Sequence, residues 1–420
     1  MAGVVDTFGG IVERVCDEHP VAARRLMRTG WQAMGLKFKF APDKRLLPAD
    51  QYLARMMMKA MLAPLKHPEE TAMVSIFVPC ELVQEAGLAP YNVEGFSCYV
   101  AATSAEQGCI QAAHAAGVPE TLCSYHRTFL GAAQRGLLPA PRCVVFTNVA
   151  CDANLLTFRT LAQHYGVPSF AIDVPRDQSE ESVRFVERQL RELKTFLEET
   201  TGAHIDDDAL SERVQRSRDT LEGFEMYQKL VAGCTVPADL VTPLYCAVTN
   251  NILLGTLEEA HYVSLLLDGA MAAPPKQGTH IYWMHTVPYL SQAMHDALYL
   301  RDGVRIVGCE LASACSSDFD PSRPYEAMAR RLVHNRFNGG ALRRIRMGIE
   351  SARTVGADGV VWFNHWGCKH TIASSQLAKR MFEEASFPFL VLDGDGGDRM
   401  AGSEGQIATR LGAFLEMLNA

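Results

Sequence analysis

The sequence predicts an α/β protein with two domains, each built on a mostly parallel sheet. The chain of 420 residues is longer than one ordinary hydrophobic core organises. Short runs of β-branched and aromatic residues alternate with amphipathic stretches of helical period, which is the pattern of βαβ units. The composition agrees, because 48% of the residues are hydrophobic and 21% are charged, as in globular proteins.

Residues 1–70 are predicted to form an N-terminal helical segment. Residues 51–62 combine good helix formers with apolar side chains at a spacing near the helical period, and Pro64 ends the pattern. The clustered methionines in this stretch are typical of adaptable packing rather than of metal binding.

A first α/β domain with a helical extension is predicted over residues 71–271. Its strands are expected to be buried because their apolar side chains are consecutive; they are residues 73–78, 143–147 and 169–175. Long helices follow Pro175. Gly202 is expected to end one of them, and the acidic residues 206–208 are expected to cap the next.

A second α/β domain is predicted over residues 272–420, after a Pro-rich linker at residues 272–278. Its expected strands are residues 280–284, 304–308, 359–363 and 388–393, with helices between them. Because both halves alternate strands with helices, we expect two doubly wound, Rossmann-like sheets with a ligand site between the domains.

Three of the twelve cysteines are predicted at strand-to-helix turns: Cys123, Cys151 and Cys368. The chain is long and has no CxxC pair, which argues against a disulfide scaffold and a zinc ribbon. Ligands of open α/β sheets bind outside the carboxyl ends of strands, so we expect these three thiols to meet in one crevice. Helix N-termini there favour the thiolate, the form that binds metals.

Three converging thiolates have several interpretations from the residues alone. They can hold a [4Fe–4S] cluster and leave one iron without a protein thiolate. They can also hold a zinc ion with a bound water, since thiolate-rich sites occur in both classes. The third interpretation is that the cysteines are scattered core residues.

Several short motifs occur in a fixed order between residues 70 and 420. They are Val78-Pro79-Cys80-Glu81-Leu82, Leu122-Cys123-Ser124, Cys151-Asp152, Ile172-Asp173-Val174-Pro175, Gly356-Ala357-Asp358-Gly359-Val360, and Gly405-Gln406 with Thr409-Arg410. Together they resemble the D-component family of 2-hydroxyacyl-CoA dehydratases, which also includes benzoyl-CoA reductase subunits. In that family three cysteines bind a [4Fe–4S] cluster, and the matching positions here are Cys123, Cys151 and Cys368.

The resemblance implies a radical dehydration. A separate ATP-hydrolysing iron–sulfur activator protein delivers one electron, which reduces the thioester carbonyl of a 2-hydroxyacyl-CoA. The ketyl radical then expels the 2-hydroxyl group, and the product is the 2-enoyl-CoA. The resemblance also implies a homologous second dehydratase subunit or a homodimer. A benzoyl-CoA-reductase-type subunit and a non-catalytic iron–sulfur electron-transfer or scaffold subunit are the alternatives.

Glu81, His126 and His365 are the candidate catalytic residues, because they flank the motif turns that face the predicted crevice. The roles of Cys80, Cys309 and Cys315 are left open. A double-cubane cluster, found in a related branch, is disfavoured because neither Cys309 nor Cys315 has the expected spacing and Ser75 stands where that branch has a cysteine.

Charge and hydropathy exclude other classes of function. The net charge of −8 provides no basic stripe for nucleic acid. No apolar run is long enough for a membrane span, and the N-terminus lacks the pattern of a signal peptide. We therefore expect a soluble cytoplasmic protein.

Overall fold

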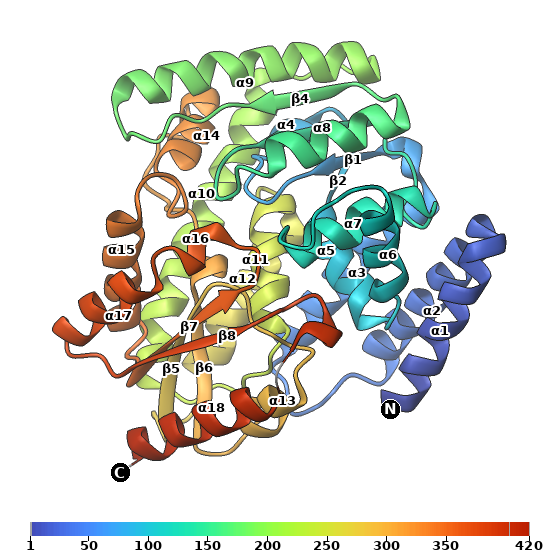
Figure 1. The fold of residues 1–420 in the computed structure, drawn as a ribbon. Helices are drawn as coiled ribbons and strands as arrows, with labels where there is room; N and C mark the ends of the chain where they lie inside the picture. The colour runs from blue at the N-terminus through green and yellow to red at the C-terminus, as the bar shows by residue number, and fades with distance from the viewer. Residues whose placement is uncertain (1, 403, 420) are drawn as a thin grey trace.

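The computed structural model describes residues 2–402 and 404–419 and confirms the α/β class (Figure 1). Within these ranges it has two four-stranded sheets, both parallel. The first sheet contains β1 (Thr71–Val74), β2 (Ala89–Asn92), β3 (Cys143–Thr147) and β4 (Ser169–Ile172). The second contains β5 (Thr279–Met284), β6 (Val304–Cys309), β7 (Gly359–His365) and β8 (Phe389–Gly394).

Both sheets have the same strand order. It is β2-β1-β3-β4 in the first sheet and β6-β5-β7-β8 in the second. In each sheet the second strand lies on one side of the first strand, and the third and fourth strands lie on the other side. Crevices form at such switch points, outside the carboxyl ends of the strands. The segments that follow β1, β3, β5 and β7 are therefore the ones that the fold places at ligand-binding positions.

Helices surround both sheets, with the first sheet at the top of Figure 1 and the second at the lower left. The N-terminal helices are α1 (Ala2–Glu18), α2 (Pro20–Phe40) and α3 (Pro48–Lys66). Those between β1 and β5 are α4 (Glu81–Glu85), α5 (Val93–Ala102), α6 (Glu106–Ala115), α7 (Ser124–Gln134), α8 (Asn154–Tyr165), α9 (Glu180–Thr201), α10 (Asp207–Leu230), α11 (Thr242–Ile252) and α12 (Leu257–Met271).

The remaining helices belong to the second sheet or bridge the two. They are α13 (Gln292–Leu298), α14 (Pro324–Val333), α15 (Ala341–Thr354), α16 (Lys369–Ile372), α17 (Ser375–Glu384) and α18 (Glu404–Asn419), with short 3-10 turns η1 (Pro68–Glu70), η2 (Val231–Gly233), η3 (Glu310–Ser313) and η4 (Arg399–Ala401). No helix of the described ranges is long and apolar enough to cross a bilayer.

The predicted helix ends around α9 and α10 are confirmed. Gly202 ends α9 in the left-handed conformation, with φ +76. The side chain of Asp206 accepts a hydrogen bond from the Ala209 backbone and begins α10. Glycine tolerates positive φ, and a short acid satisfies a free helix N–H group, so both ends follow from local chemistry.

Three local expectations were wrong. The first strand is shorter than predicted, since β1 ends at Val74 and Phe77 has φ +74, which no strand allows. Strand β2 was not predicted; its sequence Ala-Pro-Tyr-Asn lacks an apolar run. Cys123 does not follow a strand: it lies in the connection between helices α6 and α7, because the chain runs through three helices from β2 to β3.

Helix α14 connects the two halves of the molecule. It follows β6 in sequence but packs on α9, which follows the first sheet, so its apolar residues share the core of Val183 and Leu190. Arg331 on α14 forms a buried ion pair with Glu81 on α4, with Nη2 and Oε1 2.6 Å apart. These contacts restrict the motion of one sheet relative to the other. The predicted domain boundaries remain a prediction.

Helices α6 and α7 approach closely at Gly131, where a Cβ atom would collide with the carbonyl group of Cys109. Gly131→Ala is therefore expected to lower the free energy of unfolding by about 1–3 kcal/mol, because the two helices must move apart to admit the methyl group. Gly412→Ala in α18 is the control, since a Cβ atom there meets no neighbour; it should be neutral or stabilising by up to about 1 kcal/mol. Urea unfolding of both variants tests this, and equal effects would contradict it.

Candidate functional site

The turns that hold Cys123 and Cys368 contact each other across the two halves of the fold. Cys123 precedes α7, and Cys368 follows β7 and precedes α16. Gly367 has φ +81, and a Cβ atom on it would lie 2.6 Å from the Cys123 backbone nitrogen. Only glycine fits this position, because both its conformation and its close approach exclude a side chain. Cys151, which follows β3, completes the group.

The three thiols interact electrostatically, so they lie close to one another. Burial raises the pKa of the Cys123 thiol well above its usual value, and negative charge on Cys368 and Cys151 raises it further. Burial likewise raises the pKa of Cys151 to about 12, with Cys368 as the next cause. Backbone N–H groups of Tyr125 and Ala153 act in the opposite direction. Without a cation the Cys123 and Cys151 thiols stay protonated, so binding a metal there releases protons.

At least two of the three sulfur atoms lie more than 4.8 Å apart. Among the described residues, the three donor atoms that lie within 4.8 Å of one another belong to His67, Glu69 and Glu70, which are exposed, and not to the three cysteines. One zinc ion with Zn–S bonds of about 2.3 Å requires sulfur atoms about 4 Å apart. In a [4Fe–4S] cluster the thiolates lie farther apart than this, because each binds a different iron.

His365 is positioned to donate a hydrogen bond to Cys123. The Gly396 backbone N–H donates to Nδ1 of His365 (3.1 Å), so the ring proton lies on Nε2. Nε2 is 3.1 Å from Cys123 Sγ. Burial lowers the pKa of His365, and Asp395 opposes this. The neutral ring therefore presents an N–H group to the sulfur.

His126 has the opposite tautomer toward Cys151. The Thr157 hydroxyl donates to the Ala153 carbonyl (2.9 Å), so it accepts the Nδ1 proton of His126 at 3.0 Å. Nε2 lies 3.7 Å from Cys151 Sγ and is then free to accept a hydrogen bond from the thiol. Burial lowers the pKa of His126 to about 4, which keeps the ring neutral. The two histidines thus offer a donor to one thiol and an acceptor to another.

A cavity of about 870 Å³ lies beside these turns, between α6 and the loops that follow β7 and β8. Its wall includes Arg127 and Gly367, the neighbours of the cysteine turns. Arg127 lies 3.8 Å from a carboxylate oxygen of Asp395 and of Asp398, while its Nε atom and Asp395 Oδ2 are buried without a hydrogen-bond partner. The cavity volume is within the range of ligand sites in proteins.

The structure does not bring Glu81 together with the three thiols. Its Oε1 atom pairs with Arg331 at 2.6 Å and accepts a hydrogen bond from Ser217 at 2.7 Å, contacts to α14 and α10. These are the contacts of a buried structural ion pair. A catalytic role for Glu81 remains a prediction.

The three cysteines whose roles were left open each have a local partner. Cys80 Sγ donates to the Val78 carbonyl and Cys309 Sγ to the His285 carbonyl, both at 3.3 Å. The Asn335 amide lies 3.5 Å from Cys315 Sγ.

Sequence reasoning missed two polar residues near the site. Glu94 follows β2; it accepts hydrogen bonds from Asn92 and from the Ile76 backbone, and its charge acts on Cys151. Burial raises the pKa of Glu94 to about 7. His285 follows β5 with φ +77, and its buried Nδ1 has no hydrogen-bond partner. Both residues follow the end of a strand. The position of Glu94 could not be recognised because β2 was not predicted, whereas His285 follows a strand that was predicted.

Comparison with known proteins covers most of the chain. Residues 75–418 match the family model described as 2-hydroxyglutaryl-CoA dehydratase, D-component. The (R)-phenyllactyl-CoA dehydratase alpha subunit of Clostridium sporogenes is 23% identical over 366 residues, which cover 81% of this chain and 88% of that protein. The lactoyl-CoA dehydratase subunit alpha of Anaerotignum propionicum is 22% identical over 388 residues, with coverages of 81% and 89%.

The raised pKa of Glu94 predicts a pH-dependent contribution to stability. The folded chain holds this proton more tightly than the unfolded chain, so the contribution is present at acid pH and is lost as the pH rises from about 5 to about 8. As the pH rises between these values, the unfolding free energy of the wild type should fall by about 2 kcal/mol more than that of Glu94→Gln. Urea unfolding at both pH values measures it, with exposed Glu416→Gln as control. An unchanged difference would contradict the assignment.

Proposed function

Because this chain belongs to the family described as 2-hydroxyglutaryl-CoA dehydratase, D-component, we propose that it is a subunit of a radical 2-hydroxyacyl-CoA dehydratase. Its reaction removes water from a 2-hydroxyacyl-CoA and gives the 2-enoyl-CoA. The observation that carries the proposal is that Cys123, Cys151 and Cys368, from distant parts of the matched region, lie close enough to interact electrostatically.

Cys123, Cys151 and Cys368 would hold a [4Fe–4S] cluster. Their chemistry fits such a group, since the three thiols lie close enough to interact electrostatically and backbone N–H groups are nearby. When bound, a cluster with one iron free of protein thiolate supplies a one-electron couple and a Lewis-acidic position. His365 Nε2–H would stabilise the Cys123 thiolate, and His126 Nε2 would accept a hydrogen bond from the Cys151 thiol before loading.

Glu94 is the proposed proton carrier of the dehydration. With a pKa of about 7, its carboxyl group is present in both protonation states near neutral pH. The protonated acid would give its proton to the departing 2-hydroxyl group, which leaves as water. The resulting carboxylate would then take the 3-proton of the substrate radical that remains, and so return to the acid form. The enoyl-CoA radical anion left by this step would give its extra electron back to the one-electron couple of the site, so the dehydration consumes no net electron.

The cavity of about 870 Å³ would take the acyl-CoA substrate beside the cluster. Its volume suits the thioester arm. Its wall carries charges of both signs: Arg127 lies near Asp395 and Asp398, and Lys369 has no ion pair with them. The partners would be an ATP-dependent iron–sulfur activator and a second dehydratase subunit. The relatives' names, which specify alpha subunits, favour a heteromeric enzyme over a homodimer.

The ligand assignment predicts the iron content of serine variants. After anaerobic purification, wild type should contain about four iron and four sulfide per chain, and each of Cys123→Ser, Cys151→Ser and Cys368→Ser should lose most of both. Cys16→Ser is the matched control, because the Cys16 thiol is buried and donates to the Arg135 carbonyl, which a hydroxyl group also does. Full iron content in all three site variants would reject the assignment.

The substrate assignment predicts which acyl-CoA is converted. With activator, ATP and the second subunit, the protein should convert a 2-hydroxyacyl-CoA such as lactoyl-CoA or phenyllactyl-CoA to the enoyl product. The measurement is product formation by mass spectrometry. Conversion of benzoyl-CoA instead would identify a ring-reductase subunit. Bound iron without any response of its spectrum to acyl-CoA would identify a non-catalytic electron-transfer subunit.

A further inference from the structure

A buried ion pair lies directly beneath the turn that holds Cys368. Arg344 on α15 and Glu310, which follows β6, are 2% and 0% exposed. Arg344 Nε donates to Glu310 Oε1 at 2.7 Å, and Nη2 donates to Oε2 at 2.6 Å. This two-point geometry fixes the orientation of the guanidinium plane.

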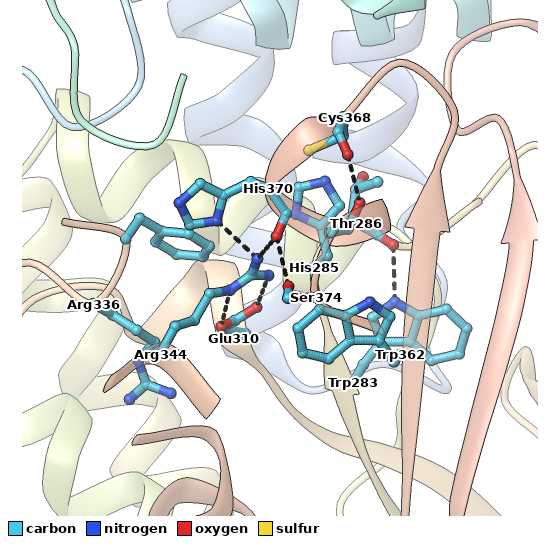
Figure 2. Close-up of polar contacts among 12 residues, drawn as sticks. Trp283, His285, Thr286, Glu310, Arg336, Arg344, Trp362, Cys368, His370 and Ser374 are labelled. Atoms are coloured by element: carbon cyan, nitrogen blue, oxygen red, sulfur yellow. Dashed lines mark hydrogen bonds and ion pairs between the residues drawn. The ribbon is translucent and has the colours of Figure 1, made fainter. Parts of the chain in front are cut away.

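The remaining nitrogen of Arg344 binds the Cys368 turn. Nη1 donates to the carbonyl oxygen of His370 at 2.7 Å and to its ring Nδ1 at 2.8 Å. Figure 2 shows the guanidinium between the Glu310 carboxylate on one side and His370 on the other. Arg344 therefore ties a segment after β7 to a segment after β6, two strands that are not neighbours in the sheet.

Aromatic packing prevents the guanidinium from moving. Its carbon atom lies 5.0 Å from the ring centroid of Phe337 and 4.9 Å from that of Trp362. Cation–π contact stabilises the charge in an interior where an unpaired arginine would be costly. The group is thus fixed by hydrogen bonds along its edge and by rings near its faces.

Backbone hydrogen bonds connect the segment that contains His370 to Cys368. The Cys368 carbonyl accepts hydrogen bonds from the backbone of Thr371 and Ile372, and the Cys368 N–H donates to the His365 carbonyl. The one-turn helix α16 therefore moves with Cys368. The charge of Arg344 also interacts with Cys368, which places a buried cation near this thiol.

We propose that Arg344 is a positioning residue: it holds the Cys368 turn in the ligand conformation and turns the positive end of its ion pair with Glu310 toward the Cys368 thiolate. The second half of this inference rests on the proposed function, because it concerns the bound cluster. A nearby cation favours the more negative, reduced state of a cluster and so raises its reduction potential. Glu310 anchors Arg344 on the side opposite His370.

The test is the double variant Arg344→Met with Glu310→Gln, which leaves neither charge alone in the interior. In the full-length chain without iron, hydrogen–deuterium exchange of residues 366–374 should become about tenfold faster or more, as expected for the loss of charge-assisted hydrogen bonds. After iron loading, the chain should retain less iron, and the potential from an EPR-monitored redox titration should be more negative than in the wild type.

Arg336→Met is the matched control. Arg336 is also buried and lies in the same region, but it donates to Tyr282 and Ser351 and points away from the turn in Figure 2. Its substitution should leave exchange of residues 366–374 and the potential unchanged. Arg344→Lys separates the two roles: it keeps the charge but cannot bridge Glu310 and His370, so exchange should be faster while the potential stays near that of the wild type.

Wild-type exchange rates in the double variant and in Arg344→Lys would overturn the positioning role. An unchanged potential in the double variant would overturn the electrostatic role. If the double variant does not fold, Arg344→Lys still decides the positioning role by exchange. A wild-type chain that binds no iron would reject the proposed function, while the exchange measurements would still decide whether Arg344 holds the turn.

Discussion

The structure depends on one constraint, the meeting of two parallel sheets at their switch points. Each sheet has its first and third strands side by side, so the segments after β1, β3, β5 and β7 lie where the fold leaves a crevice. Cys151 and Cys368 come from equivalent positions of the two sheets, after β3 and β7. Cys123 reaches the same place from a helix connection, because Gly367 lets the two turns touch. A site assembled from both halves requires that the halves stay fixed, and the packing of α14 on α9 provides this.

Burial gives the site its chemical character. The interior raises the pKa of Cys123 and Cys151, so that thiolates persist there only with compensating positive charge or hydrogen-bond donors. Those groups are present: His365 Nε2–H, backbone N–H groups at the helix starts, and the cation of Arg344. Glu94 and His126 are shifted by burial in opposite directions, the carboxyl group toward and the imidazole away from protonation. The same low polarity therefore favours the protonated forms of the Cys123 and Cys151 thiols and of the Glu94 carboxyl group, and the neutral ring of His126.

The sequence allowed the fold class, the strand-to-helix alternation and the positions of Cys151 and Cys368 after strands to be predicted, because each depends on local pattern or on a general rule of parallel sheets. It did not allow β2 to be predicted, since Ala-Pro-Tyr-Asn pairs only through the tertiary structure, and Glu94 was missed with it. The position of Cys123 between two helices was also missed, because a helix start looks the same whatever precedes it. The Glu310–Arg344–His370 contacts join residues that have no periodic relation in sequence, so no pattern reports them.

An anaerobic crystal structure of the iron-loaded protein, with anomalous scattering measured at the iron edge, tests the central claim most directly. We expect one compact group of four irons between the sulfur atoms of Cys123, Cys151 and Cys368, with one iron that no protein thiolate binds. Iron held elsewhere, or bound through other cysteines while these three remain free, would contradict it.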